Sequence, residues 1–433
     1  MCVVFKINKK IHVCALLIFS ILLSGSVCAE TLMDAFAKAY MHNAKLNSER
    51  AAVRISSDDV VIARSGFFPQ IEGVGSYGRS KLMVGPYTTS GSLGIRLNQR
   101  LFDGFVTQNI FSSAQVKLQA QREYLRNVEQ NTFLDTVTAY ANVYQARRIA
   151  DLRRENLAAL EEQVRSNKAK FDVGEGGRVD LSQAQAARSV ALSELSLARA
   201  DVKSAEAVYR QVIGSDPEKL IRPPVANNLP VNLDAAYQMS VAMHPAILYA
   251  KHLVDASLYN VKAKEGTLLP KIDLSATASY NRIYTGAGED GVSKSIAISL
   301  SVPIFEGGRT SAQIRQSREQ LGQAHLQLDL AYSNIRQALT SAWFQLEGAR
   351  ASVIAYRESV RAAEIALKGR VQENRVGQAT TLDVLNSRTQ LINAQIALAT
   401  AERNAIVAGY SVQSSIGKLT ADYLGLKIIQ YVQ

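Results

Sequence analysis

Short segments with alternating apolar and polar residues are the first pattern in the chain. Isoleucine, leucine or valine fills every second position of residues 296–304, and apolar residues alternate in much the same way over residues 93–101. Period two over about ten residues is typical of a β-strand with one apolar face. Similar segments follow Pro69 and Pro270, so the sequence predicts four strands, two in each half. The pattern alone fits two soluble hairpins packed on helices as well as part of a membrane barrel.

Long helical segments occupy most of the remaining chain. Residues 87–216 and 304–433 contain no proline, and residues 105–173 contain no glycine. This last stretch is rich in good helix formers, and an unbroken helix over it would be about 100 Å long. Apolar residues repeat there at steps of three and four, so we expect the helix to pack on similar long helices through a coiled-coil seam. Its other face is expected to be exposed to solvent. The seam consists of Leu134, Val137, Ala141 and Tyr144. A shorter helix is predicted before each strand pair, over about 32–65 and 233–265.

The two halves of the chain are copies of each other. Short motifs recur at an offset of 201 to 203 residues, and one register over most of the chain indicates tandem duplication of a large structural half. Val173 and Gly174 recur as Val376 and Gly377, and Asp180 recurs as Asp383. The motif after the second strand of each copy is Phe102, Asp103, Gly104 in the first and Phe305, Glu306, Gly307 in the second.

Glycine-containing segments end both long helical stretches. They lie around Gly174 and Gly177 in the first copy and around Gly377 in the second. Glycine readily adopts the positive backbone angles that a helix reversal needs. We therefore expect each long helix to turn there and to return as a shorter helix.

The N-terminal residues predict export. Three lysines precede an apolar run from Ile11 to Leu23, and small residues follow up to Ala29, as in a cleaved secretory signal peptide. The run is too short to span a bilayer, and a lipidated Cys28 is a further alternative. All three cysteines lie in this segment, so its removal would exclude a disulfide framework and a cysteine-bound metal.

The predicted domain organisation follows the duplication. Residues 1–29 are the signal peptide, 30–214 the first structural repeat, 215–232 a linker, 233–417 the second repeat and 418–433 a C-terminal tail. No later apolar run is long enough for a transmembrane helix, so membrane contact would come from strands or a surface face. Four strands cannot close in lipid, whereas three chains would supply twelve, enough for a conducting barrel. We therefore predict a trimer.

Composition and motifs argue against other functions. The formal charge of +11 falls to +8 without residues 1–29, and the basic residues are dispersed, so nucleic acid is not an expected partner. Residues 73–78 fit the dinucleotide fingerprint, but a turn and a second strand follow instead of a helix. His42 and His244 occupy matching places and are expected to pack or cap helices. Since no catalytic or metal-binding cluster appears, we expect neither enzyme activity nor a metal or other cofactor.

The signal peptide, the duplication, the Phe-Asp/Glu-Gly motif and an Asp six residues after each Val-Gly together resemble the TolC-like outer-membrane factor family. The resemblance covers nearly the whole mature chain. It implies a mainly α protein with a small β-barrel: a homotrimer with a twelve-stranded barrel in outer-membrane lipid and an α-barrel of coiled coils in the periplasm. Residues 215–232 and the tail would contribute to a collar around the α-barrel.

The resemblance also implies a function. Members are passive exit ducts in the outer membrane of Gram-negative cells, within tripartite efflux pumps or type I secretion systems. They dock a periplasmic adaptor, also called a membrane fusion protein, and an inner-membrane transporter. The cargo, drugs or secreted polypeptides, stays open. The alternative from another class is a soluble periplasmic coiled-coil adaptor or scaffold without a pore.

The resemblance places a periplasmic gate at the second helix turn. Asp383 matches the first aspartate of the family's constriction, whereas Asn386 stands at the position of the second. Asn374 and Ala379 stand where the family's best-studied pattern has a tyrosine and an arginine, so the latch of the gate differs here.

Charged residues at the first turn suggest how the negative charge at the gate is compensated. A symmetric trimer would gather three Asp383 carboxylates, and like charges brought together need a counter-charge, a cation or protons. Our hypothesis is that Arg178 supplies part of it, with Asp180 nearby; the alternative is a solvated turn and a helix cap. The tip turns at Gly174, Gly177 and Gly377 are the expected adaptor-docking sites.

Overall fold

The computed structural model describes residues 29–81, 83–286 and 288–426. The predicted signal peptide, except Ala29, and residues 427–433 of the tail lie outside the described residues. The chain forms two compact units, and each takes segments from both sequence copies. The first unit contains the described residues up to Ala39 together with Asp135–Val225 and Arg350–Val407. The second contains Tyr40–Leu134, Ala226–Ala349 and the described residues from Ala408 onward.

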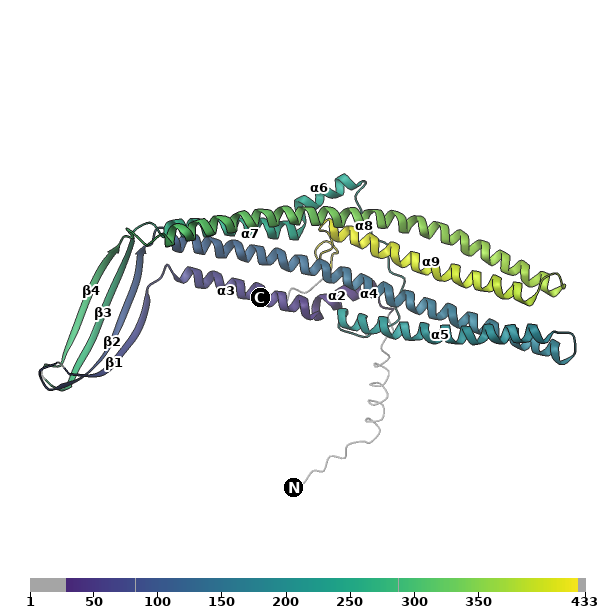
Figure 1. Cartoon of the computed structure of the whole chain (residues 1–433), viewed down its shortest axis with the longest axis horizontal. Helices are drawn as coiled ribbons and strands as arrows, with labels where there is room; N and C mark the ends of the chain where they lie inside the picture. Colours follow the sequence, from purple (N-terminus) through teal and green to yellow (C-terminus); the bar gives the residue numbers. More distant parts are fainter. Residues whose placement is uncertain (1–28, 82, 287, 427–433) are drawn as a thin grey trace, which may run out of the picture. The chain divides into compact units, whose positions relative to one another are not determined.

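The same order of elements occurs in both copies, as the sequence repeat predicts (Figure 1). Corresponding helices have nearly equal lengths: 11, 22, 67 and 36 residues in the first copy, and 11, 22, 67 and 35 in the second. The first copy comprises α2 (Leu32–His42), α3 (Ala44–Ser65), β1 (Gln70–Lys81), β2 (Tyr87–Phe102), α4 (Val106–Asp172) and α5 (Arg178–Ile213). The second comprises α6 (Leu233–Met243), α7 (Pro245–Gly266), β3 (Lys271–Thr285), β4 (Gly291–Ser301), α8 (Arg309–Arg375) and α9 (Thr381–Ser415).

The shorter helices differ from the prediction, because each is broken in two. The expected helix over 32–65 stops at His42, and Asn43 caps the next helix by accepting a hydrogen bond from Leu46 N. The expected helix over 233–265 stops at Met243, and His244 caps α7 through Nδ1. Both capping residues have extended backbone angles, so they redirect the chain between the two helices. The predicted capping role of the two matching histidines is confirmed for His244. In the first copy, Asn43 caps the helix instead of His42.

Antiparallel helix pairs form the first unit. In Figure 1, α5 returns beside α4 and α9 returns beside α8. The ion pair Arg153–Glu194, with 2.6 Å between Nη1 and Oε2, joins α4 to α5. Buried residues of three helices form one hydrophobic cluster, as expected for coiled-coil seams. The cluster contains Leu157, Leu160, Ala191, Leu195 and Leu385.

One stretch of α4 in the first unit is buried almost all round, which corrects the expectation of a wet outer face there. Tyr140 is fully buried, and its hydroxyl shares its one hydrogen between Glu30 O at 2.7 Å and Ile221 O at 2.8 Å. Glu30 also forms a parallel β-bridge with Leu220, so residue 30 and the segment around residue 220 both lie on α4. The buried residues of this stretch are Thr136, Val137, Ala139, Tyr140, Ala141 and Val143.

The second unit combines a helical core with one sheet. Its core packs α6, α8 and α9 together through small and aliphatic side chains. The sheet is antiparallel in the order β1-β2-β3-β4, so β1 and β4 are its edges. The core residues are Ala236, Leu339, Ala342, Leu346, Ala408, Val412 and Ile416. In the described part of the chain, no helix is both long and apolar enough to cross a membrane.

Candidate functional site: a two-faced sheet and two helix turns

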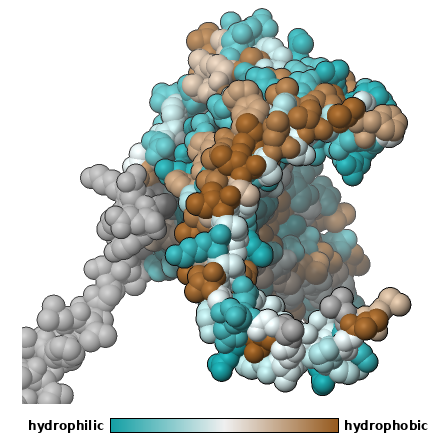
Figure 2. All heavy atoms as spheres, turned by 90° about the vertical axis from the view of Figure 1, so that its left-hand side faces the viewer, coloured by the Kyte–Doolittle hydropathy of each residue, from teal (hydrophilic) through white to brown (hydrophobic). Residues whose placement is uncertain are grey.

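One face of the sheet is apolar and exposed. The strand register brings alternate residues of the four strands onto this face, and their side chains are not covered within the chain. Figure 2 views the molecule from its strand end and shows hydrophobic residues gathered in a band. Lys294 lies among them on edge strand β4, where its long side chain can extend toward a polar boundary. The exposed apolar residues of this face include Ile71, Leu93, Ile95, Tyr280, Val292, Ile296, Ile298 and Leu300.

The opposite face is polar. Serine, threonine, asparagine and charged residues alternate with the apolar residues, and several pair across neighbouring strands. Ion pairs join Arg96 to Glu72 at 3.1 Å and Arg100 to Asp273 at 3.3 Å. Hydroxyl contacts of 2.8 Å link Ser76 with Ser92 and Ser279 with Ser293. One apolar and one polar face is the arrangement of a sheet between lipid and water.

Tyrosines and basic residues gather at the hairpin end of the sheet. The rings of Tyr77 and Tyr284 lie 5.7 Å apart, and the guanidinium of Arg79 lies 4.3 Å from the ring centre of Tyr87. Arg282 lies over the ring of Tyr284 at 5.3 Å. Aromatic rings with basic partners are typical of a membrane–water boundary.

The repeated motif after the second strand of each copy starts the long helix. Asp103 is buried, and its Oδ2 accepts hydrogen bonds from Thr107 N and Oγ1 at the start of α4. Gly104 has a φ of +71°, and a Cβ atom there would lie 2.2 Å from Gly266 O. In the second copy Glu306 bonds with the hydroxyl of Thr310. The structure thus gives the motif a structural role, as a junction between strand and helix.

The two glycine turns reverse the chain as predicted. Gly174 and Gly377 have φ values of +79° and +78°. In both turns the next residue's amide bonds the carbonyl five positions earlier: Glu175 N with Lys170 O at 2.9 Å, and Gln378 N with Glu373 O at 2.8 Å. Val173 and Val376 precede the two glycines and are exposed by 70% and 71%. Both turns therefore present an apolar side chain.

Asp383 caps α9 within its own chain. Its Oδ2 accepts hydrogen bonds from Thr380 N at 2.9 Å and Thr380 Oγ1 at 2.7 Å, while Asp383 N donates to Thr380 Oγ1 at 3.2 Å. The hydroxyl and amide of Thr380 lower the pKa of Asp383, so the carboxylate stays ionised near neutral pH. Thr380 was not among the residues predicted from the sequence, although a threonine three residues before an acid is the signal of such a cap.

The other predicted gate residues lie in the first two turns of α5 and α9. Arg178 begins α5, is exposed, and forms no ion pair within the described residues. Asp180 lies in the first turn of α5, and Asn386 is exposed on α9. Asn374 Nδ2 donates to Ala379 O at 2.9 Å, which closes the second turn on itself.

An exposed apolar sheet face, boundary tyrosines and 67-residue helices define the class of outer-membrane channel proteins. The family model described as "Outer membrane efflux protein" matches residues 36–215 and 236–418. The chain belongs to this family.

Individual relatives agree with the family match. The chain is 51% identical to the outer membrane efflux protein BepC of Brucella suis, over 99% of this chain and 94% of the relative. It is 25% identical to the outer membrane protein TolC of Escherichia coli, over 90% of this chain and 83% of TolC. The solved structure of the outer membrane protein VceC of Vibrio cholerae aligns with a TM-score of 0.77 at 17% identity, covering 89% of this chain and 96% of VceC.

The protein is therefore an outer-membrane efflux channel, and it is not an enzyme. This finding overrules the alternative of a soluble adaptor or scaffold. Across the described residues, no group of three or more His, Cys, Asp or Glu side chains could hold a metal ion.

Proposed function

We propose that three copies of the chain complete one twelve-stranded barrel and form a passive exit duct. The observation that carries this proposal is the four-stranded sheet, which has two edge strands and one exposed apolar face. Open edges cannot face lipid, because each unpaired backbone group would lose its hydrogen bonds to water. Joining β1 of one copy to β4 of the next removes both edges, and twelve strands leave room for a water-filled lumen.

A matched pair of lysine substitutions tests this barrel. Ile298 and Ala297 are neighbours on β4 and point to opposite faces. We expect Ile298→Lys to cost about 2–4 kcal/mol per protomer and to reduce the yield of detergent-resistant trimers, because it places a charge in lipid. Ala297→Lys should keep the trimer and change the ion selectivity of single channels in planar bilayers. Equal tolerance of both substitutions would contradict a lipid-facing sheet.

We propose that the second helix turn forms the gate, with Asp383 and Asn386 at the constriction and Arg178 and Asp180 close by. The Asp383 carboxylate supports the proposal, because an aspartate is charged at neutral pH and three copies brought together would repel one another. Arg178 is exposed and can supply a counter-charge across a subunit boundary.

Single-channel conductance of Asp383→Asn, Asp383→Ala and Arg178→Ala tests the gate. Asparagine keeps an acceptor for the helix cap but removes the charge, so it separates gating from capping. We expect larger conductance for Arg178→Ala, which leaves the three carboxylates uncompensated, and smaller conductance for both Asp383 variants, which remove the repulsion that opposes closure. Conductance unchanged from the wild type in all three would remove the gate assignment.

We propose that the two tip turns dock a periplasmic adaptor, which connects the duct to an inner-membrane transporter. The turns around Gly174, Gly177 and Gly377 support this, because Val173 and Val376 present exposed apolar side chains at equivalent places. We expect Val376→Asp to abolish efflux in cells while trimer levels stay normal. Normal efflux by a double Val173→Asp and Val376→Asp variant would contradict docking at these turns.

We propose small toxic compounds as the cargo, since the relative at 51% identity is named an efflux protein. Deleting the gene should raise drug susceptibility, and complementation should reverse it. A deletion strain with unchanged drug susceptibility but a depleted set of secreted proteins would favour polypeptide secretion instead.

A further inference from the structure

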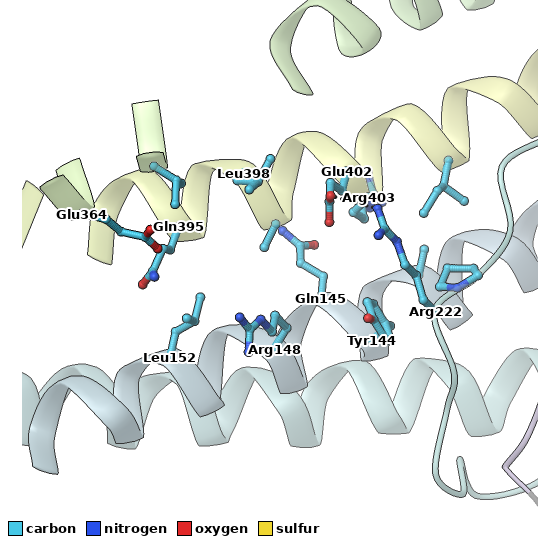
Figure 3. A pocket seen from close by; sticks show the side chains of 15 residues that line it. Tyr144, Gln145, Arg148, Leu152, Arg222, Glu364, Gln395, Leu398, Glu402 and Arg403 are labelled. Carbon is cyan, nitrogen blue, oxygen red and sulfur yellow. Dashed lines mark hydrogen bonds and ion pairs between the residues drawn. The ribbon is translucent and has the colours of Figure 1, made fainter. Parts of the chain in front are cut away.

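A cavity of about 230 Å³ lies within the first unit, away from the helix turns. Residues of α4, α8 and α9 and the linker residues Arg222 and Pro223 form its walls (Figure 3). All of them belong to the same compact unit. The cavity therefore brings together four segments that are far apart in the sequence.

Two arginines at this cavity form no ion pair within the described residues. Arg403 is half-buried, and its Nε and Nη1 donate to the amide oxygens of Asn142 at 2.8 Å and Asn404 at 3.0 Å. Burial lowers the pKa of Arg403, so this guanidinium carries its charge in a partly desolvated place. Arg148 reaches toward the same space from α4 (Figure 3) and is exposed. Uncompensated guanidinium groups at a cavity favour an anion with oxygen atoms.

One of the two acids that line the cavity, Glu402, already forms ion pairs with other arginines. Its Oε1 accepts from Arg222 at 2.9 Å and from Arg357 at 3.3 Å. Glu364 lies beside Gln395 at the opposite side of the cavity in Figure 3. The lining contains three arginines and two glutamates, so its formal charge is +1. This sign also favours an anion.

The remaining lining is suited to a small hydrocarbon body. Leu152 of α4 and Leu398 and Ile406 of α9 supply apolar surface, and Tyr144 adds an aromatic ring. Apolar walls with a few convergent polar groups are typical of small-molecule sites. An inorganic ion would leave this apolar surface unused.

We propose that the cavity binds a small organic carboxylate, whose oxygen atoms are held by Arg148 and Arg403 and whose hydrocarbon part lies against Leu152 and Leu398. The ligand would contact α4 and α9 together and so bridge the two helix pairs of the first unit. This site is separate from the proposed gate, and it stands whether or not the gate assignment holds.

Binding to the purified mature protein in detergent tests the proposal. Isothermal titration with benzoate should show saturable binding, whereas benzyl alcohol, which has the same ring without the charge, should not bind. Arg148→Gln and Arg403→Gln should each weaken benzoate binding at least tenfold. Arg148 is exposed, so its variant keeps the fold even if Arg403→Gln does not. Arg165→Gln, at an exposed arginine of α4 outside the cavity, should bind as the wild type does.

Three results would overturn the proposal. The first is no saturable benzoate binding. The second is binding that both Arg148→Gln and Arg403→Gln leave unchanged. The third is inorganic phosphate binding as tightly as benzoate, since the site would then select an oxyanion without using its apolar wall.

Discussion

His244 should make the stability of the second unit depend on pH. The side chain is 5% exposed, and its Nδ1 accepts a hydrogen bond from Ala246 N at 3.2 Å at the start of α7. Only the neutral ring can accept this bond, and a protonated ring would place a positive charge at the positive end of the helix dipole. Burial lowers the pKa of His244 from its ordinary value near 6.5 to about 4.

The size of the effect follows from this pKa. The unfolded chain binds a proton near pH 6.5, whereas the folded chain does so only near pH 4. The stabilisation is therefore complete above pH 6.5 and is lost as the pH falls toward 4, by about 1.4 kcal/mol per pH unit for each protomer. The whole window corresponds to about 3 kcal/mol per protomer.

The substitution His244→Asn tests this reasoning. Asparagine is a good cap, as Asn43 shows at the start of α3, and it does not titrate. We expect the free energy of unfolding of the wild type to fall relative to that of the variant by about 2–3 kcal/mol per protomer between pH 7.5 and 4.5. Denaturant unfolding followed by circular dichroism would measure it, with His325→Asn, at an exposed histidine, as the control. Parallel pH profiles for wild type and His244→Asn would refute the argument.

Two further substitutions test how the chain is held together. Gly104→Ala should destabilise the protein more than Gly307→Ala, because the new Cβ would collide with Gly266 O, whereas Gly307 has open space and carries only the cost of a positive φ, about 1–2 kcal/mol. Equal denaturation midpoints for the two variants would contradict a close contact at Gly104. Tyr140→Phe should cost about 1–3 kcal/mol in the free energy of unfolding, because the carbonyls of Glu30 and Ile221 lose their buried donor. An unchanged unfolding free energy would show that water replaces the hydroxyl.

The sequence predicted the main elements because their signals are local. The absence of both proline and glycine over residues 105–173 favours a long helix, and alternating residues around Ile298 indicate a strand. The helix turns were also predictable, since Gly174 and Gly377 need positive φ angles.

The features that the sequence did not predict depend on tertiary contacts or on weaker signals. The breaks at Asn43 and His244 depend on capping, and the surrounding segments have helical composition throughout. The residues around Tyr140 are buried because residue 30 and the linker lie on α4. The spacing of apolar residues along α4 does not indicate this contact. The cavity between Arg148 and Arg403 needs four distant segments, so neither residue stands out in the sequence.

The equal lengths of α4 and α8 limit how this protein can change in evolution. An insertion of seven residues into one of these helices alone would move its turn by about 10 Å along the axis, out of step with its counterpart. Both copies would have to gain or lose the same number of turns together. Compensated insertions and deletions in the two halves of homologous genes are therefore the expected trace of this constraint.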